Sequence, residues 1–158
     1  MRGKTAPKRI ISPDPIYNSI LLQKFINRVM ISGKKTVAQN LIYKAFDQIK
    51  ETTKEDPLSV FEKAITTVEP RMEVRPRRVG GASYQVPTEV RGNRRQTLAI
   101  RWIIEAAKSK SNKEFHSFDK KLAEELINAS RGDGIAFKKK EDIQKQAAAN
   151  RAFAHFRW

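Results

Sequence analysis

The chain has 158 residues, of which 32 are lysine or arginine and 17 are acidic, so its formal net charge is +15. This length predicts a single domain, 1–158, with a substantial core, and the charge excess favours a polyanionic partner. There is no cysteine and no apolar run long enough for a membrane span or a signal peptide, which argues against disulfides and secretion. We therefore expect a cytoplasmic protein, or one made inside an organelle, without a membrane partner.

Residues 1–15 are predicted to form an extended basic tail. They contain prolines and charges without an apolar period, which is typical of a segment that is disordered until it binds a partner. A frayed terminus without function is the alternative. The candidates for contact with a polyanion in this tail are Arg2, Lys4, Lys8 and Arg9.

Three amphipathic helices are predicted between the tail and residue 70. Apolar residues recur with helical spacing over 20–33, 37–49 and 57–68. The turn before the second helix carries two further candidate residues, Lys34 and Lys35. The expected core side chains of the whole chain lie on helices: Leu22, Phe25, Ile26, Leu41, Ile42, Phe46, Phe61, Ile65, Leu98, Ile103, Leu122 and Leu126.

The stretch 71–101 contains eight arginines and no lysine, although lysine outnumbers arginine in the rest of the chain. Arginine has a planar fork of donors that binds phosphate through two hydrogen bonds, and it also stacks on bases. Two runs with β-forming residues, Met72–Val79 and Ser83–Val90, flank Gly80-Gly81. This pattern predicts a β-hairpin arm over 72–90.

A proline in each strand, Pro76 and Pro87, indicates that no further strand pairs with this hairpin. The arm offers few apolar side chains to a core, so we expect it to protrude. With Gly80-Gly81 at the centre of the turn, Arg77 faces Tyr84, a cation beside an aromatic ring. A solvated ribbon with no binding role is the alternative. The candidate binding residues of the arm are Arg75, Arg77, Arg78 and Tyr84.

The fourth helix is expected to be capped by Asn93, and its start carries unusual charges. Arginines cluster at the positive end of the helix dipole, where each cation costs about 0.3–1 kcal/mol. A bound anion would reverse this cost, because free N–H groups and arginine side chains would converge on it. Glu89 offsets only part of the cluster. The candidates here are Arg91, Arg94, Arg95 and, further along the helix, Arg101.

Two more helices are predicted to complete the chain. Ser117 can cap the fifth, and Glu124-Glu125 are expected on its solvated face. The last helix begins near Ile135 and, with the aromatic end of the chain, forms the segment 135–158. Its first turns contain Lys138-Lys139-Lys140, which would need a nearby anion. We expect the final aromatic residues to pack on the rest of the protein.

Nothing in the sequence resembles an active site. The only histidines, His116 and His155, are far apart in the sequence and suggest neither a metal site nor a catalytic base. We therefore expect no enzymatic activity, no cofactor and no metal.

Together these elements predict a mainly α protein, a bundle of about six helices with a protruding two-stranded β-hairpin arm and a basic N-terminal tail. The run Arg77–Arg91 resembles the hairpin signature of the family of bacterial-type small-subunit ribosomal protein seven. Asp14–Tyr17, Gly33–Lys35 and Ala152–Trp158 resemble the same family, so the resemblance extends from end to end.

The resemblance implies a structural constituent of the small ribosomal subunit that acts in translation. Family members are primary rRNA-binding proteins that organise the 3′ major (head) domain, and their hairpin lies near exit-site tRNA and the mRNA path. Small-subunit ribosomal proteins nine and eleven are implied as neighbours. Gly92 stands where many members have proline, which implies a looser joint between the hairpin and the next helix. The family's basic positions fall on Lys34, Lys35, Arg77, Arg78, Arg91, Arg94 and Arg95.

Two alternatives arise from the physical reading alone. One is a sequence-specific DNA-binding helical protein, although no predicted helix presents basic residues along a recognition face, and arginine beside tyrosine on a ribbon suits splayed single strands. The other is an RNA-modifying enzyme, which the missing cofactor loop and the missing catalytic cluster oppose.

Overall fold

The computed structural model describes residue 3 and residues 9–156 of the chain. They are mainly α-helical, with one two-stranded antiparallel sheet, which confirms the predicted fold class. Two compact units are distinguished, Met1–Asn40 and Leu41–Trp158. Among the described residues, no helix is both long enough and apolar enough to cross a bilayer.

In the first unit, a turn with a buried carboxylate precedes α1 (Ile20–Val29). The Asp14 side chain is 1% exposed and accepts hydrogen bonds from the backbone N–H groups of Ile16 and Tyr17, both at 3.1 Å. Ser19 caps α1 through its hydroxyl oxygen. Asp14 is therefore already part of the folded structure, so an extended tail is shorter than residues 1–15.

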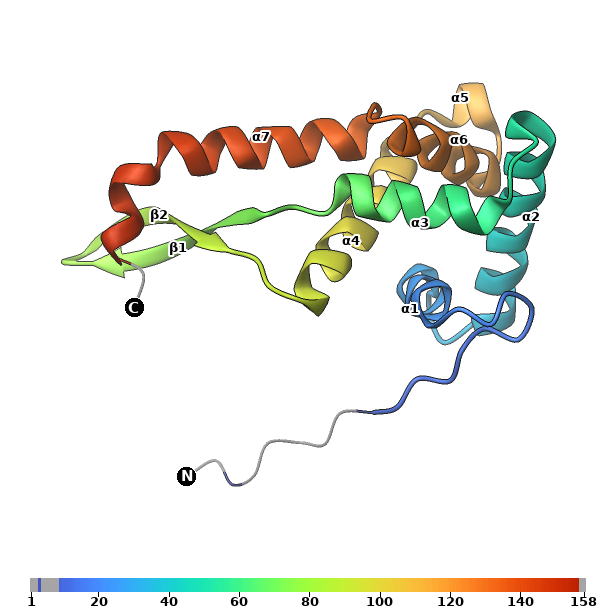
Figure 1. The fold of residues 1–158 in the computed structure, drawn as a ribbon, viewed down its shortest axis with the longest axis horizontal. Coiled ribbons are helices and arrows are strands. Elements are labelled where there is room, and N and C mark those ends of the chain that lie inside the picture. Colours follow the sequence, from blue (N-terminus) through green and yellow to red (C-terminus); the bar gives the residue numbers. More distant parts are fainter. Residues whose placement is uncertain (1–2, 4–8, 157–158) are drawn as a thin grey trace. The chain divides into compact units, whose positions relative to one another are not determined.

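The second unit contains a group of helices and the hairpin arm, which extends to one side of them with α7 and η1 beside it (Figure 1). The helix α2 (Lys35–Thr53) begins in the first unit and continues into the second. In the second unit, α3 (Pro57–Val68) packs on α4 (Asn93–Ser109) and α6 (Phe118–Ser130), and α7 (Ile135–Ala149) packs on all three. The short helix α5 (Asn112–Phe115) and the 3-10 helix η1 (Arg151–Phe156) were not predicted.

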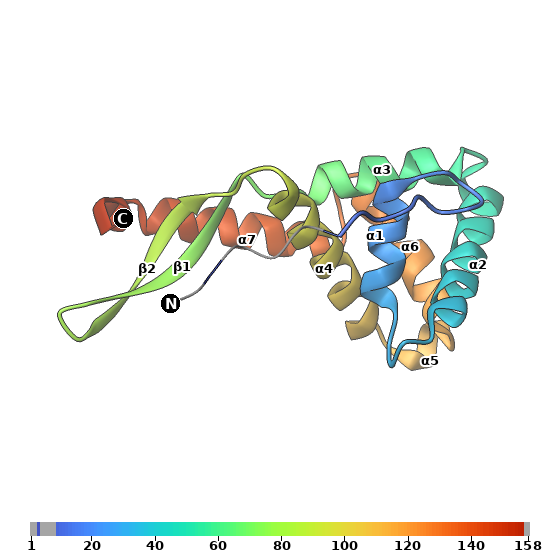
Figure 2. The same ribbon diagram turned by 90° about the horizontal axis from the view of Figure 1, so that it is seen from below.

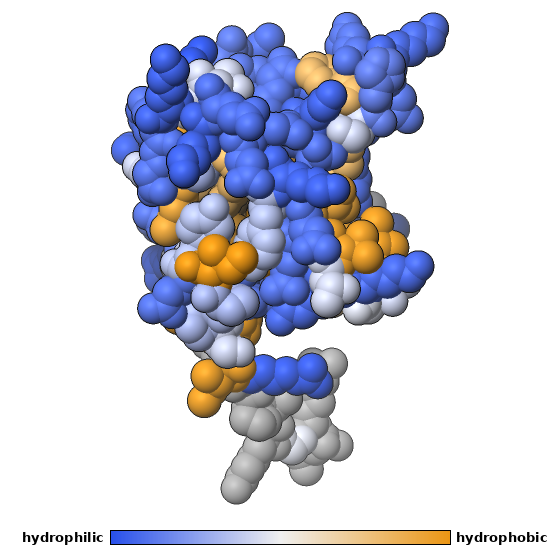
Figure 3. Space-filling model, turned by 90° about the vertical axis from the view of Figure 1, so that its right-hand side faces the viewer, coloured by the Kyte–Doolittle hydropathy of each residue, from blue (hydrophilic) through white to orange (hydrophobic). Residues whose placement is uncertain are grey.

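The predicted core side chains are buried, apart from Leu41, which is half-buried. Phe46 of α2 and Phe61 of α3 place their ring centroids 5.8 Å apart, a distance at which aromatic rings attract each other. The expected start of α3 is confirmed, because Asp56 accepts a hydrogen bond from the N–H of Ser59 and Pro57 occupies the first turn. Hydrophilic residues cover most of the face drawn in Figure 3.

One prediction for α6 is wrong: Glu125 is fully buried rather than solvated. Its Oε1 accepts a hydrogen bond from the N–H of Ala136 at 2.9 Å, and its Oε2 lies 3.1 Å from Nζ of Lys110. This carboxylate therefore joins the first turn of α7 to the residue that follows α4. The side chain of Glu124 stays 43% exposed, because adjacent residues of a helix point in different directions.

Two of the three lysines in the first turns of α7, Lys139 and Lys140, have partners within the protein, so these two do not require an external anion. Lys139 forms an ion pair of 2.6 Å with Glu105, and Lys140 donates to the carbonyl oxygen of Thr67. Burial, together with the nearby charge of Arg71, lowers the pKa of Lys140.

The hairpin consists of β1 (Met72–Val79) and β2 (Ala82–Glu89), so the second strand begins one residue earlier than predicted. Figures 1 and 2 show α7 running beside the arm, while the hairpin tip extends past η1. At the base of the arm Val86 and Pro87 are buried, whereas Arg77, Arg78 and the turn are exposed. The arm therefore protrudes at its tip only, and its base is part of the packed unit.

Candidate nucleic-acid interface

The register of the hairpin determines which side chains of the arm lie together. Gly80 and Gly81 form the turn with φ of 56° and 91°, values that favour glycine. Arg77 pairs with Tyr84 across the strands, as predicted. Because paired residues of an antiparallel sheet lie on the same face, these two side chains share one face of the arm.

The ring of Tyr84 already has two aromatic partners within the chain. Phe153 and Phe156 of η1 place their ring centroids 5.2 Å from that of Tyr84. The 3-10 helix η1 therefore packs on the hairpin, in agreement with the expectation for the aromatic residues that the structure describes, whereas Trp158 lies outside the described residues. Stacking of a base on Tyr84 stays a prediction. Tyr84 is half-exposed, so a base would have to stack on the part of the ring that η1 leaves uncovered.

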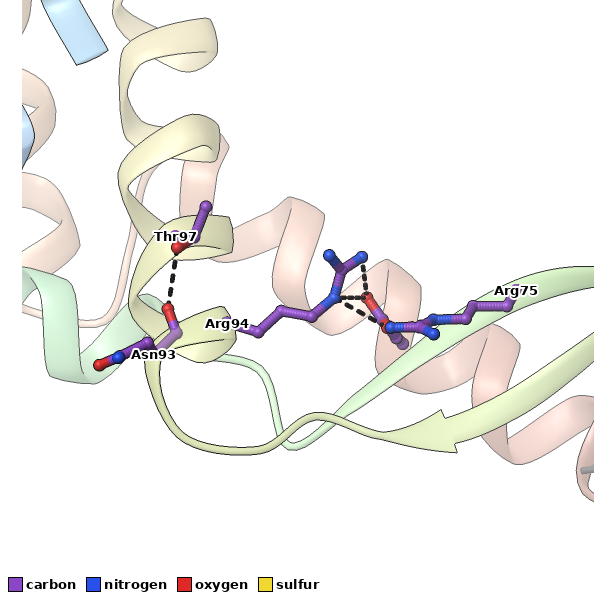
Figure 4. A network of polar contacts seen from close by, with 5 residues as sticks. Arg75, Asn93, Arg94 and Thr97 are labelled. Carbon is purple, nitrogen blue, oxygen red and sulfur yellow. Dashed lines mark hydrogen bonds and ion pairs between the residues drawn. The ribbon is translucent and has the colours of Figure 1, made fainter. Parts of the chain in front are cut away.

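A buried carboxylate connects the arm to α4. Glu73 of β1 is 6% exposed, and its two oxygens accept hydrogen bonds from Nε of Arg94 at 3.0 and 2.9 Å. Arg75 binds the same carboxylate through Nε and Nη2. Figure 4 shows the two arginines reaching this carboxylate from different elements. The side chains of Arg75 and Arg94 stay 47% and 51% exposed, so both still face solvent.

The charges of this cluster keep Glu73 ionised. Burial alone would raise the pKa of Glu73, but the hydrogen bonds and charges of Arg94 and Arg75 outweigh it and lower the pKa. The hydrogen bond to Glu73 in turn raises the pKa of Arg94. Glu73 was not among the predicted site residues, because nothing in a strand pattern indicates that a residue 21 positions before Arg94 lies against it.

The start of α4 differs from the prediction in its cap. Gly92 rather than Asn93 is the N-cap residue, and no side chain caps the helix. Gly92 has a φ of 49° and a ψ of −133°, which residues with a Cβ rarely adopt. The Asn93 side chain does not cap the helix; the backbone carbonyl oxygen of Asn93 accepts a hydrogen bond from the Thr97 hydroxyl at 2.8 Å (Figure 4). A looser joint at Gly92 stays a prediction.

The other arginines beside this helix start have weaker acidic partners. Glu89 lies 3.8 Å from Arg91 and 3.9 Å from Arg95, at the limit of an ion pair. Nε of Arg95 also donates to the carbonyl oxygen of Val90 at 2.7 Å. The Arg91 side chain is 80% exposed. Four arginines thus surround two carboxylates, which leaves a net positive surface; we call it the arginine surface, and it consists of Arg75, Arg91, Arg94 and Arg95.

The remaining candidates among the described residues are exposed but lie elsewhere. Arg101 is two helical turns after Arg94, on the same side of α4. Lys34 and Lys35 are exposed in the first unit, as is Arg9. Arg2, Lys4 and Lys8 lie outside the described residues. The structure thus brings Arg75 of β1 together with the candidates at the start of α4, whereas Arg77 and Arg78 lie towards the tip of the arm and the candidates of the first unit are not placed relative to the others.

Comparison with known proteins identifies the family. Residues 1–151 match the family described as ribosomal protein S7p/S5e. The chain belongs to this ribosomal protein family. It is 56% identical over 158 residues to small ribosomal subunit protein uS7 of Thermotoga maritima, and 55% identical to that of Thermosipho africanus, with both chains covered completely. The uS7 of Carboxydothermus hydrogenoformans is 56% identical over 99% of each chain.

Membership of the S7p/S5e family answers the main question that the sequence left open. The chain is a structural, rRNA-binding protein of the small ribosomal subunit, it acts in translation as part of a ribonucleoprotein, and it is not an enzyme. The DNA-binding and RNA-modifying alternatives are therefore wrong. The hairpin that suggested this family is the same arm that carries three of the candidate arginines.

Proposed function

We propose that the arginine surface binds rRNA of the 3′ major (head) domain, and that the protein organises this domain early in assembly. The observation that carries this proposal is the Glu73 cluster, in which a buried carboxylate holds two half-exposed guanidinium groups side by side. A guanidinium has five N–H donors, so Arg75 and Arg94 keep donors for a phosphate after binding Glu73.

The charge balance supports an external polyanion at this surface. Glu73 neutralises part of the cluster, and the distances of 3.8 and 3.9 Å from Glu89 allow only weak pairing with Arg91 and Arg95. The positive end of the α4 helix dipole adds to the positive potential there. An RNA phosphate at this helix start would reduce the repulsion among the arginines.

The tip of the arm supports a separate contact. Arg77 and Arg78 are exposed beyond the part of the hairpin that is buried. We propose that this tip lies near exit-site tRNA and the mRNA path, and that small-subunit ribosomal proteins nine and eleven are neighbours. We further propose that the basic residues of the first unit and Arg101 bind rRNA phosphates, and that the protein resides in cytoplasmic ribosomes or those of an organelle.

The experiment compares two RNA fragments of matched length, one from the 3′ major domain and one from the 5′ domain of small-subunit rRNA. We expect tight binding of the first only, measured by filter binding at fixed salt. Replacing Arg91, Arg94 and Arg95 by glutamine together should weaken that binding at least tenfold. Equal binding of both fragments, or unchanged binding by the triple variant, would contradict the proposal.

A further inference from the structure

A groove of about 520 Å³ lies between the hairpin, α4 and α7. Its volume is in the range of pockets that hold small organic ligands. Four apolar side chains form part of its wall: Val74 of β1, Leu98 and Trp102 of α4, and Ile143 of α7. An apolar wall of this kind suits the flat face of an aromatic ring.

Amide side chains line the rest of this groove. Gln85 extends from β2, Gln146 lies in α7, and Asn150 follows its last turn. Within the part of the chain that the structure describes, these three side chains have no hydrogen-bond partner in the protein. A primary amide both donates and accepts, so these groups can match the edge of a nucleobase.

The groove also borders on the two arginines of the Glu73 cluster. Glu73 is one of its lining residues, and its carboxylate positions Arg75 and Arg94 (Figure 4). Both arginines are about half-exposed, and each reaches the groove only through its contact with Glu73, so a phosphate that they bind would lie beside the groove rather than in it. An apolar wall and three amides thus lie next to a pair of arginines, and these groups suit the ring, the edge and the phosphate of a nucleotide.

We propose that this groove binds one unstacked nucleobase of single-stranded RNA, with the adjoining phosphate held by Arg75 and Arg94. The inference rests on the proposed function, because it names a subsite of the same RNA-binding surface. Proteins that recognise single-stranded RNA commonly splay a base out and bind its edge by hydrogen bonds. Glutamine and asparagine amides pair with adenine through two hydrogen bonds, so adenine is the preferred base.

The groove can be tested with mononucleotides and the fluorescence of Trp102. The chain has two tryptophans, so Trp158→Phe leaves Trp102, which is 4% exposed, as the only one. We expect adenosine 5′-monophosphate to change its emission and to bind at least tenfold more tightly than ribose 5-phosphate. The affinity for uridine 5′-monophosphate should lie between those for adenosine 5′-monophosphate and ribose 5-phosphate.

Two substitutions of the same kind on α7 provide the control. Gln146→Leu should weaken the binding of adenosine 5′-monophosphate at least fivefold and leave the affinity for ribose 5-phosphate unchanged. Gln144→Leu should change neither, because Gln144 lines a different groove, on the side of Arg71 and Arg151. Thermal melts of both variants verify that the fold is intact.

Three results would overturn the inference: equal affinity for the nucleotide and ribose 5-phosphate, nucleotide binding by calorimetry without a change at Trp102, or equal effects of both substitutions. The same proteins are also tested on the 3′ major-domain rRNA fragment. If that fragment binds normally while the nucleotide does not, only the groove is contradicted. If the unaltered chain does not bind the fragment, the proposed function itself fails.

Discussion

Glu73 of β1 and Arg94 of α4 are joined by two hydrogen bonds, of 3.0 and 2.9 Å, both from Nε of the arginine. This pair fixes the base of the arm to the helix that follows it, across the turn at Gly92. It also explains how arginines are tolerated at the positive end of α4, because an internal carboxylate offsets part of their repulsion. The cluster therefore serves both stability and RNA binding, and the two roles can be separated.

The first prediction concerns pH. The pKa of Glu73 is lower in the folded protein than its ordinary value of about 4.3. A carboxyl group of this kind stabilises the fold above its unfolded pKa, and the contribution is lost as the pH falls through the folded pKa. Glu73→Gln should therefore reduce the free energy of unfolding at pH 7 by about 1–2 kcal/mol, and by much less at pH 3. Urea unfolding at both pH values measures this.

Glu69 provides a control of opposite sign. Burial raises its pKa although Arg95 lies nearby, so folding favours its protonated form. Its ionised form costs stability as the pH rises through the folded pKa. The difference in the free energy of unfolding between Glu69→Gln and the unaltered chain should thus shift in favour of the variant from pH 3 to pH 7. If the stabilities of Glu73→Gln and Glu69→Gln, each relative to the unaltered chain, changed with pH in the same direction, the assigned directions of the two pKa shifts would be wrong.

The second prediction concerns the salt dependence of rRNA binding. Each neutralised phosphate contributes about 0.7–0.9 to the slope of log affinity against log salt concentration. Arg91 is 80% exposed and has only a distant acidic partner, so Arg91→Ala should lower the slope by roughly one unit without affecting the melt. Arg131→Ala changes the same charge at an exposed position outside the arginine surface and should leave the slope unchanged. Equal slopes for the two variants would remove Arg91 from the interface.

The sequence predicted those features of the fold that are determined by residues close together in the chain. Helical spacing located α3, Asp56-Pro57 marked its start, and Gly80-Gly81 determined the hairpin register. Glu73 and Glu125 were missed, because the partners that make their burial possible come from other elements. An isolated glutamate in a polar stretch is most often solvated, and only the tertiary structure supplies the guanidinium or ammonium group that pairs with it.

The third prediction concerns Glu125. It is fully buried and lies 3.1 Å from Lys110, whose side chain is 9% exposed. Glu125→Gln leaves this buried cation without its close partner, so we expect a loss of about 3 kcal/mol in the free energy of unfolding. Glu124→Gln is the matched control, since that side chain is 43% exposed and should contribute less than about 1 kcal/mol. A loss for Glu125→Gln no larger than the control would show that Lys110 does not depend on this pair.

A related change tests the space around the same carboxylate. Gly134 has a φ of 96°, and a Cβ there would lie 2.9 Å from Oε1 of Glu125. Gly134→Ala should therefore destabilise the protein through both backbone strain and this close approach, by more than about 1 kcal/mol. Gly132→Ala, at a φ of 80° but with open space around the Cβ, isolates the backbone part. Equal losses would show that Glu125 moves aside freely.

The last prediction separates the tip of the arm from its base. Arg78 pairs with Ser83 and Val79 with Ala82, so deleting these four residues removes two facing pairs and leaves Gly80-Gly81 to connect Arg77 with Tyr84. The pairing of the remaining strands stays in register, and side chains keep their faces because an even number is removed from each strand. The tip is mostly exposed, so the unfolding free energy should change by only about 0.5 kcal/mol.

Tyr84→Ala in the full-length arm should lower the free energy of unfolding by more than the four-residue deletion does, although it removes only one side chain. The ring contacts Phe153 and Phe156, and each aromatic pair contributes about 0.5–1.5 kcal/mol beyond its buried area. Urea unfolding measures the free energy of unfolding of the shortened arm and of Tyr84→Ala. Phe156→Ala should show part of the loss seen for Tyr84→Ala, because it removes one of the same ring contacts. A shortened arm that unfolds more easily than Tyr84→Ala would place the main stabilising contacts at the tip. In ribosomes rebuilt with the shortened arm, rRNA assembly should proceed normally while retention of exit-site tRNA falls, because the deletion removes Arg78 and brings the Gly80-Gly81 turn two residue pairs closer to the base of the arm.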